Sequence, residues 1–514
     1  MAQTQKYTAR EFYLEDVTRT LFPLNTNKVL IEHGADKLAA YATSLISGVG
    51  SFQPQHRVFA NKDALHLRRT VKLDAVAELF IYTIVYNHRN LFRAPKRKDR
   101  QHFGYRFENG RPISASLSYG DFKEAIHKLA FASEEYISFD ISSYFNSIYH
   151  HDIVSWFGSI GADDAAVGSL GKLLRETNAG RSLDCLPQGL YPTKMIGNDF
   201  LRFIEESSLV RSKHVLRFMD DVYLFDDDAE VVRSDFAMLQ KLIGSKGFSV
   251  NSSKTFESVY EGVSETDDQI DELKMRLLKR RREIMVSHYD PTEEASDVVD
   301  DESEDDQDDN DPEVDEDEYD AKPLSEEELE YVSILLNKPN LSEEDAELIL
   351  VVTRDHAEIL SDHLPRFAAS FPHLAKHLYG LCKDIANKDA VASVIVNVVS
   401  SERYVSEFQL FWFGAMLESY LMETPQAPDL IRGLFEHRNS TDITKAKILE
   451  IPDQRYGLPD MRATYLGDGR SDWLAWSSAV GCRHLKSAPR NYSLKYFAKA
   501  SPFNALIADI VWHI

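Results

Sequence analysis

The sequence is poor in cysteine and has no long apolar segment. Its 514 residues include three cysteines, widely separated at Cys185, Cys382 and Cys482. Such a sparse, odd set argues against a disulfide framework and against a cysteine-based zinc cluster. The longest apolar runs, 79–86 and 391–399, are too short to span a bilayer, and the first residues lack the apolar centre of a signal peptide. We therefore expect a cytoplasmic protein without a membrane partner.

Basic residues are missing from one stretch of the chain. Residues 293–320 contain 18 Asp and Glu and no Lys or Arg. A segment this charged cannot bury enough surface to order itself, so we predict a disordered acidic tract. It would be a solvated linker, or a nucleic-acid mimic or self-inhibitory tail that lies on a basic surface. The net charge is −25, and −7 remains without this tract, so the acidic average does not exclude nucleic acid as a partner.

The composition of the chain is globular, with 43% apolar and 11% aromatic residues. Pattern and charge divide it into a mixed helix and strand segment (1–262), a charged insert (263–322) and a helical segment (323–514). The main elements expected are helices at 74–92, 234–248 and 267–285, a strand at 135–141, two strands joined by a turn within 215–226, and a strand at 249–262.

Three aspartates stand out because apolar residues surround them. Asp220 and Asp221 lie in the run LRFMDDVYLF, and Asp140 lies in YISFDI. Adjacent charges in such runs are costly to bury unless something compensates them, and a divalent metal can do so. Oxygen ligands suit Mg²⁺, and two ions about 3.5–4 Å apart can stabilise both oxygens of an in-line phosphoryl displacement. The alternative is that these are ordinary turn or strand-end acids.

Four motifs follow in an order that suggests a family. The chain carries SFDISSYFNSIYHHDI from Ser138, LPQGLYPTKMIGNDFL from Leu186, RFMDDVYLFDDD from Arg217 and GFSVNSSKTF from Gly247. These resemble the A, B, C and D motifs of the reverse transcriptase palm, and residues 62–82 resemble the fingers. The resemblance implies an α+β fold, with fingers and a palm built from an antiparallel sheet plus helices. An all-α C-terminal domain with the character of helical repeats would follow.

The resemblance also implies a nucleotidyltransferase that uses dNTPs and two Mg²⁺ ions, for which Mn²⁺ could substitute. By motif position, Asp140, Asp220 and Asp221 would be both the catalytic residues and the metal ligands. Phe145 would be the steric gate, a bulky ring that crowds a ribose 2′-hydroxyl. The other nucleotide-binding positions would be Gln188 and Gly189 in the second motif, Lys254 in the fourth, and Lys62 with Arg68 or Arg69 in the fingers, the choice between the two arginines being open.

No recognisable thumb follows the fourth motif, and this narrows the resemblance. The layout is similar to the abortive-infection reverse transcriptases of bacterial phage defence, the AbiK and P2-prophage group. This implies antiviral DNA synthesis in the bacterial cytoplasm, template-independent and primed by a tyrosine of the protein. The product would be single-stranded DNA attached covalently, and the enzyme a homo-oligomer. Tyr41 is a candidate for the priming residue, with an ordinary core or surface tyrosine as the alternative.

Other functions stay open. A retron-like reverse transcriptase would copy an RNA into DNA, so the template could be RNA, DNA or none. A second alternative is a helical toxin domain, because Arg432 and His437 fit the R-x₄-H spacing of HEPN ribonucleases. A third is a non-catalytic scaffold that binds nucleic acid. Residues 89–111 hold eight basic and two acidic residues among four aromatic ones, which favours phosphate pairing and base stacking there.

Overall fold

The computed structural model describes residues 7–133, 135–259, 276–278, 280 and 324–514. The predicted acidic tract 293–320 lies outside the described residues, as does most of the helix predicted at 267–285. The described part of that helix contacts the C-terminal segment, since Leu277 is buried there and Arg280 Nη1 lies 3.2 Å from Glu328 Oε2.

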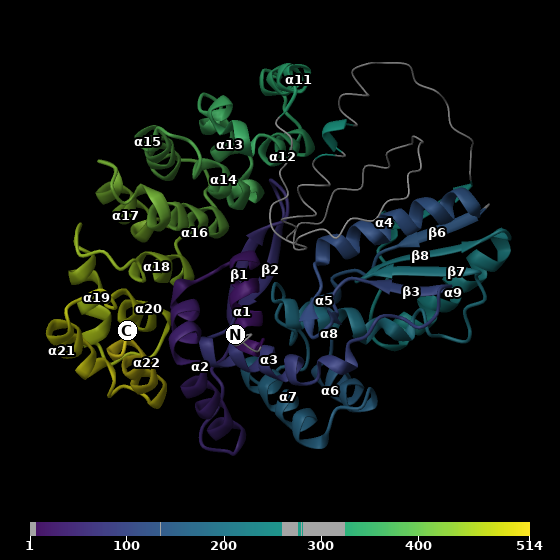
Figure 1. The fold of residues 1–514 in the computed structure, drawn as a ribbon, viewed down its shortest axis with the longest axis horizontal. Coiled ribbons are helices and arrows are strands. Elements are labelled where there is room, and N and C mark those ends of the chain that lie inside the picture. Colours follow the sequence, from purple (N-terminus) through teal and green to yellow (C-terminus); the bar gives the residue numbers. More distant parts are fainter. Residues whose placement is uncertain (1–6, 134, 260–275, 279, 281–323) are drawn as a thin grey trace, which may run out of the picture.

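Five strands form one mixed sheet, the palm sheet, in the order β3-β7-β8-β6-β9. β3 runs parallel to β7, and the other neighbours are antiparallel. This sheet confirms the α+β fold, and the two strands predicted within 215–226 form its central hairpin (Figure 1). The strands are β3 (Arg100–Phe103), β6 (Glu135–Phe139), β7 (His214–Phe218), β8 (Asp221–Asp226) and β9 (Phe256–Val259).

Helices cover both faces of the palm sheet. Phe122 of α4 (Ala115–Ala132) packs on Phe218 and Tyr223, which share one face. Phe236 of α9 (Ala229–Ser245) packs on Phe139, which faces the other way. Side chains alternate across a strand, so the apolar residues of both faces are buried in this way. The helix predicted at 234–248 thus begins at Ala229, because the Asp228 side chain caps it by accepting from the Glu230 amide.

The predicted strand at 249–262 is wrong over its first half. Asn251 accepts a hydrogen bond from the Ser253 amide, and this local bond favours the 3₁₀ turn η4 (Ser252–Lys254) over an extended chain. Only β9 follows as a strand.

A hairpin and several helices make up the fingers region. The hairpin pairs β1 (His56–Asn61) with β2 (Leu67–Lys72). The helix predicted at 74–92 ends earlier, as α3 (Ala75–Asn87), and the turn η2 (Arg89–Leu91) follows it. The remaining described elements that precede the C-terminal segment are α1 (Ala9–Asp16), η1 (Val17–Arg19), α2 (Asn25–Ile46), β4 (Phe107–Glu108), β5 (Arg111–Pro112), α5 (Tyr144–Ser147), α6 (His150–Ser159), α7 (Asp164–Thr177), α8 (Tyr191–Phe200) and η3 (Leu201–Phe203).

The described C-terminal residues, 324–514, form helices without strands, as expected. They run from the top of the molecule in Figure 1 down its left side. They are α11 (Glu326–Leu336), α12 (Glu343–Val352), η5 (Arg354–Leu360), α13 (Leu364–Ser370), η6 (Pro372–Leu374), α14 (Ala375–Cys382), α15 (Lys388–Val399), α16 (Glu407–Met416), the π-helical turn η7 (Leu417–Leu421), α17 (Ala427–Glu436), α18 (Asp442–Leu449), α19 (Leu458–Gly467), α20 (Trp473–Gly481), α21 (Ser487–Phe497) and α22 (Pro502–Trp512).

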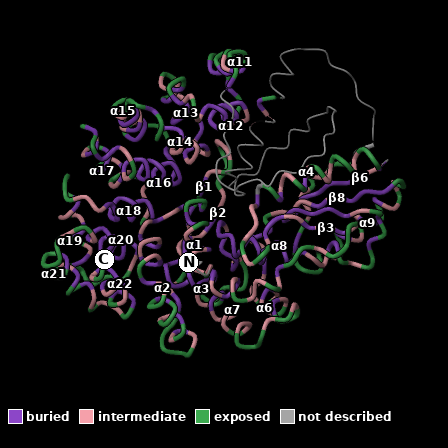
Figure 2. Tube along the Cα trace, viewed as in Figure 1, coloured by how far each residue is buried: buried purple, intermediate pink, exposed green. Residues whose placement is uncertain are grey.

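One hydrophobic core joins the two ends of the chain. It runs from α1–α3 and the palm into α16, α18, α20 and α22, and Figure 2 shows the buried stretches that meet there. Gly34 of α2 lies against Ile510 of α22 so closely that a β-carbon would collide with it. A second core lies among α11–α17. The predicted boundaries at 262 and 322 stay predictions, but the packing does not stop at them.

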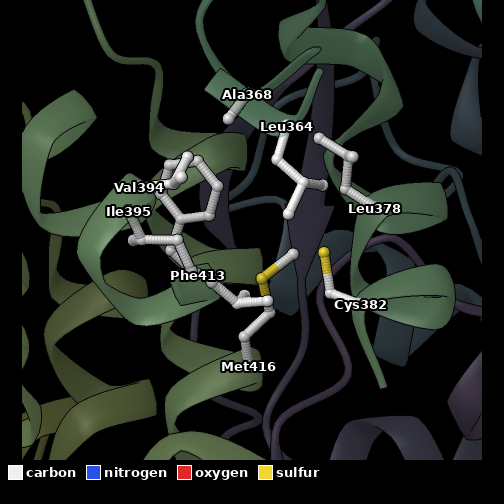
Figure 3. Close-up of a pocket in the computed structure, with 9 residues that line it drawn as sticks. Leu364, Ala368, Leu378, Cys382, Val394, Ile395, Phe413 and Met416 are labelled. Carbon is white, nitrogen blue, oxygen red and sulfur yellow. The ribbon is translucent and has the colours of Figure 1, made fainter. Parts of the chain in front are cut away.

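A small pocket lies among α13–α16 (Figure 3). Its free space is about 10 Å³, enough for a single water molecule, so it is not a nucleotide site. No described helix is both long and apolar enough to cross a membrane. The pocket is lined by Leu364, Ala368, Leu378, Cys382, Val391, Val394, Ile395, Phe413 and Met416.

Candidate active site

The three aspartates lie at one end of the palm sheet. Asp140 follows the last residue of β6, and Asp221 begins β8. Phe139 pairs with Val222 in antiparallel register, so one step further along the ladder brings Asp140 and Asp221 to facing positions. Asp220 occupies the β7–β8 turn beside them. The sheet therefore brings Asp140 to the same end as Asp220 and Asp221, although Asp140 precedes Asp220 by 80 residues in sequence.

Buried polar groups hold the turn that carries Asp220. Met219 adopts a left-handed conformation, with φ of 53°, which is costly for a residue with a side chain. The Asn198 amide oxygen accepts a hydrogen bond from the Met219 amide at 3.2 Å, and Arg217 Nη1 donates to the Met219 carbonyl at 2.9 Å. Both main-chain polar groups of Met219 are thus satisfied from behind, which fixes where Asp220 points.

Arg217 is itself held by an acid. Its guanidinium is fully buried and forms a two-point ion pair with Glu205, at 2.8 and 2.7 Å. Burial alone would raise the pKa of the Glu205 carboxyl, but Arg217 outweighs it and brings that pKa from 4.5 to about 2. His102 Nδ1 lies 3.0 Å from the same carboxylate. Such bidentate pairs are geometrically specific, so Glu205 orients the arginine that supports the turn.

Asn251 ties the fourth motif to Asp140. Its amide nitrogen donates to Asp140 Oδ2 at 3.2 Å, and its main-chain amide donates to the Asp140 carbonyl at 2.8 Å. The sequence motifs did not predict a role for this residue, for Arg217 or for Glu205. The position of Asn251 inside GFSVNSSKTF was a usable signal, because an asparagine just before a turn commonly forms side-chain hydrogen bonds to nearby backbone groups, as Asn251 does with the Ser253 amide.

The donor set fits divalent metal chemistry. Carboxylates at one sheet edge are the oxygen ligands that Mg²⁺ prefers. Within residues 7–133, 135–259, 276–278, 280 and 324–514, no three His, Cys, Asp or Glu side chains are drawn together closely enough to hold an ion as they stand. Binding would therefore require the three carboxylates to turn toward a shared ion.

Phe145 packs beside this edge. It lies in α5, is 9% exposed, and its ring sits where a β-carbon on Gly197 of α8 would meet it at 3.1 Å. The neighbouring Tyr144 donates to the Gly197 carbonyl at 2.7 Å. Burial raises the pKa of Tyr144, Arg217 opposes this, and the charge of Asp220 adds to it. That electrostatic coupling places α5 close to the aspartate turn.

The second motif forms a tight loop against the fingers hairpin. The Gln188 carbonyl accepts a hydrogen bond from Thr70 Oγ1 at 2.7 Å. Gly189 has φ of 107°, which disfavours any side chain, and Thr70 Oγ1 would lie 3.9 Å from a β-carbon there. The backbone of this loop can therefore approach the hairpin and any ligand between them closely.

The β1–β2 hairpin places Arg68 and Arg69, the two arginines predicted to contact the triphosphate, on opposite faces. Arg68 pairs with Ala60, on the face that holds buried Val58 and Thr70. Arg69 lies on the opposite face, where its Nη2 contacts Asp184 Oδ2 at 3.0 Å. Lys62 is exposed in the turn that follows β1. Arg68 thus shares a face with Thr70, which bonds the second-motif loop, and Arg69 lies on the other face beside Asp184.

Two more predicted residues occupy separate places. Lys254 ends η4, three residues after Asn251, and is half-buried. Tyr41 of α2 stacks on Phe503 of α22, with ring centroids 6.1 Å apart, and burial raises its pKa. Figure 1 places α2 beside the C-terminal helices, away from the palm sheet.

The predicted base-stacking role of residues 89–111 is wrong for most of its aromatic rings. Phe92, Tyr105 and Phe107 are 1%, 2% and 8% exposed and belong to the core. Arg100 is buried as well and donates to main-chain carbonyls, including that of Val210. The rings and Arg100 are buried together in the packed structure, so the alternation of basic and aromatic residues does not mark an exposed binding surface over most of this stretch.

Known proteins match part of the chain. Residues 89–281 match the family model described as reverse transcriptase (RNA-dependent DNA polymerase). Among solved structures, a telomerase from Candida albicans in complex with a fragment of telomeric RNA is similar at 9% identity, over 82% of this chain and 68% of that one, with a TM-score of 0.28. A likeness this low supports no argument. No curated protein matches. The chain thus contains a reverse transcriptase domain, which indicates a DNA polymerase of that type.

Proposed function

We propose that this protein synthesises DNA without a template, on a tyrosine of its own chain, and acts in abortive-infection phage defence. Asp140, Asp220 and Asp221 would hold two divalent ions. The observation that supports the catalytic part is the location of these three aspartates at one end of the palm sheet, where Asn251 donates to the Asp140 carbonyl and Asn198 accepts from the Met219 amide next to Asp220. The narrower role draws support from the sequence layout, in which a helical segment stands where a thumb would be.

Each residue of the candidate site would have a separate role in nucleotide addition. Bound Mg²⁺ would supply charge neutralisation at the reacting phosphate. Arg68 would bind the triphosphate, since a guanidinium can contact phosphate oxygens in pairs, and Lys62 would add a second cation. Phe145 would exclude a ribose 2′-hydroxyl, Gln188 and Gly189 would seat the nucleotide, and Lys254 would give a proton to the departing pyrophosphate.

The experiment is incubation of the full-length protein with labelled dNTPs and Mg²⁺, without nucleic acid, followed by a denaturing protein gel. We expect DNase-sensitive label that migrates with the protein. The double variant Asp220→Ala, Asp221→Ala should carry none. The matched control is Asp227→Ala, at the far end of β8, where the carboxylate pairs with Lys213 on the surface; it should label as the wild type does.

Other outcomes would redirect the proposal. Extension of an added primer on RNA, with no label on the protein, would indicate the retron-like alternative. Full labelling of a Tyr41→Phe variant would remove Tyr41 as the primer. A monomer by light scattering would contradict the proposed homo-oligomer. Loss of RNA cleavage in a His437→Ala variant would instead support the ribonuclease alternative.

A further inference from the structure

The C-terminal end of the chain carries charge of one sign. From residue 473 to residue 508 there is no Asp or Glu, although the whole chain has a net charge of −25. The two acids that flank this window are engaged, because Asp472 pairs with Arg470 and Asp509 pairs with Lys37, each at 2.6 Å. The basic residues inside the window are Arg483, Lys486, Arg490, Lys495 and Lys499.

Helix α21 presents part of this window to solvent on one side. Tyr492, Lys495, Tyr496 and Lys499 are spaced at i, i+3, i+4 and i+7, so they follow a single face into the turn after the helix. Tyr492 is 83% exposed and Tyr496 is 56% exposed. Within the described part of the chain, the side chains of these two tyrosines and two lysines have no hydrogen-bond, ion-pair or ring partner. We call this set the α21 face.

The opposite side of α21 is anchored. Leu494 and Phe497 are buried in the main core. Arg490 donates to the carbonyls of Arg483 and Trp512, at 3.2 and 2.8 Å. The helix therefore cannot roll to bury its tyrosines, and its apolar side is not available to insert into a lipid surface. Figures 1 and 2 show α21 at the outer edge of the molecule, with exposed stretches along it.

We propose that the α21 face binds single-stranded nucleic acid. Two exposed aromatic residues at i and i+4, whose β-carbons lie about 5–6 Å apart on one helix face, offer platforms for unstacked bases. The lysines beside them can pair with phosphates, and this charge interaction holds the backbone of a strand without reading its sequence. A duplex keeps its bases stacked inside, so it could use the lysines but not the rings. The aromatic residues thus favour a single strand over other polyanions.

The test uses preformed oligonucleotides and no dNTPs, so its outcome does not depend on the proposed polymerase activity. The full-length protein is bound to 20-mers of bromodeoxyuridine and bromouridine, irradiated and digested with trypsin. We expect cross-links in the peptides Asn491–Lys495 and Tyr496–Lys499. Binding measured by fluorescence anisotropy should weaken at least 5-fold for Tyr492→Ala and for Tyr496→Ala. The lysine double variant Lys495→Gln, Lys499→Gln should reduce the salt slope by about 1.4.

Several results would overturn the proposal. One is cross-linking confined to other peptides, which would place the strand elsewhere on the protein. Another is equal affinity for duplex and single strand, or equal competition by polyglutamate, which would reduce the face to a simple cationic patch. The control is Tyr404→Ala, because Tyr404 is 63% exposed in a different loop and its loss should change nothing. Equal binding of DNA and RNA strands would support the proposal and leave the sugar undiscriminated.

Discussion

Two asparagines act on the aspartates of the candidate site. Asn251 donates to the Asp140 carboxylate, and Asn198 accepts from the amide next to Asp220. Neither is charged, so neither would be a metal ligand of first choice. Their effect is to restrict where the carboxylates can point, and outer partners of this kind affect metal affinity strongly.

Replacing Asn251 tests this positioning. Asn251→Ala removes the side-chain donor to Asp140 but keeps the main-chain bond. We expect nucleotide incorporation to fall about 10- to 100-fold, with a higher Mg²⁺ concentration needed for half-maximal rate. The measurement is rate against Mg²⁺ concentration. Asn337→Ala is the control, because Asn337 bonds only to an exposed helix end. An unchanged Mg²⁺ requirement would show that Asn251 has only a structural role.

Glu205 makes stability depend on pH. Its folded pKa of about 2 lies below the ordinary 4.5, so its carboxylate stabilises the fold above pH 4.5 and loses that effect as the pH falls toward 2. The contribution is about 3 kcal/mol. In Glu205→Gln we expect lower stability at pH 7, with a difference from wild type that shrinks toward pH 2. Urea unfolding at pH 7 and pH 3 measures it. An equal difference at both would refute the assignment.

At the scale of elements, the fingers hairpin is held by the C-terminal helices. Glu407 at the start of α16 accepts from the Phe59 amide of β1 at 3.0 Å and from the Thr441 hydroxyl. Glu343 of α12 accepts from the Ala64 amide, at the tip of the hairpin, at 3.2 Å. The hairpin that carries the predicted triphosphate contacts is therefore oriented by residues more than 270 positions away in sequence.

Loss of the Glu407 contact should affect nucleotide binding more than turnover. In Glu407→Ala the Phe59 amide loses its acceptor, which costs about 1–3 kcal/mol and frees β1 to shift. We expect KM for dNTP to rise several-fold with a smaller change in kcat. Steady-state incorporation kinetics measure both. Glu402→Ala, an exposed acid nearby, is the control, and a fall in kcat alone would contradict the expectation.

At the scale of the whole molecule, the N-terminal region and the C-terminal helices share one hydrophobic core. Glu450 of the C-terminal region is fully buried, and its carboxylate accepts from the Asn25 and Thr26 amides at the start of α2, at 3.0 and 2.6 Å. Lys447 neutralises it at 2.8 Å. A carboxylate at a helix N-terminus is favourable, and here it comes from the other end of the chain.

We therefore expect the fingers region to unfold when the C-terminal helices are removed. A fragment of residues 1–262 would expose the part of the core that α20 and α22 cover, and would leave α2 without its cap. We expect this fragment to be insoluble or to lack a cooperative thermal transition. The milder Glu450→Ala should lower stability by about 1–3 kcal/mol, because it leaves the buried Thr26 amide without its acceptor, while Lys447 keeps its ion pair with Glu418 at 2.7 Å. A soluble fragment that unfolds cooperatively would show that the predicted boundary at 262 separates independent domains.

Local pattern was enough for part of the site. The Asp-Asp turn between two apolar runs predicted the β7–β8 hairpin, and the strand before Asp140 was predicted to within two residues, because alternation and turn chemistry depend on neighbours in sequence. The roles of Arg217 and Glu205 were not visible, since a buried ion pair looks like two surface charges until the chain brings them together. The burial of most aromatic rings in residues 89–111 was not visible either, because it depends on contacts with segments far away in sequence.

The sequence by itself singled out the three aspartates, Phe145, the basic residues of the hairpin and the helical character of the C-terminal segment. Tertiary structure decided how they are held. The separation of Arg68 from Arg69, the anchoring of the hairpin by Glu407, the capping of α2 by Glu450 and the exposure of the α21 face all depend on contacts between distant segments. Local sequence patterns cannot predict such contacts, because burial and pairing are properties of the packed chain.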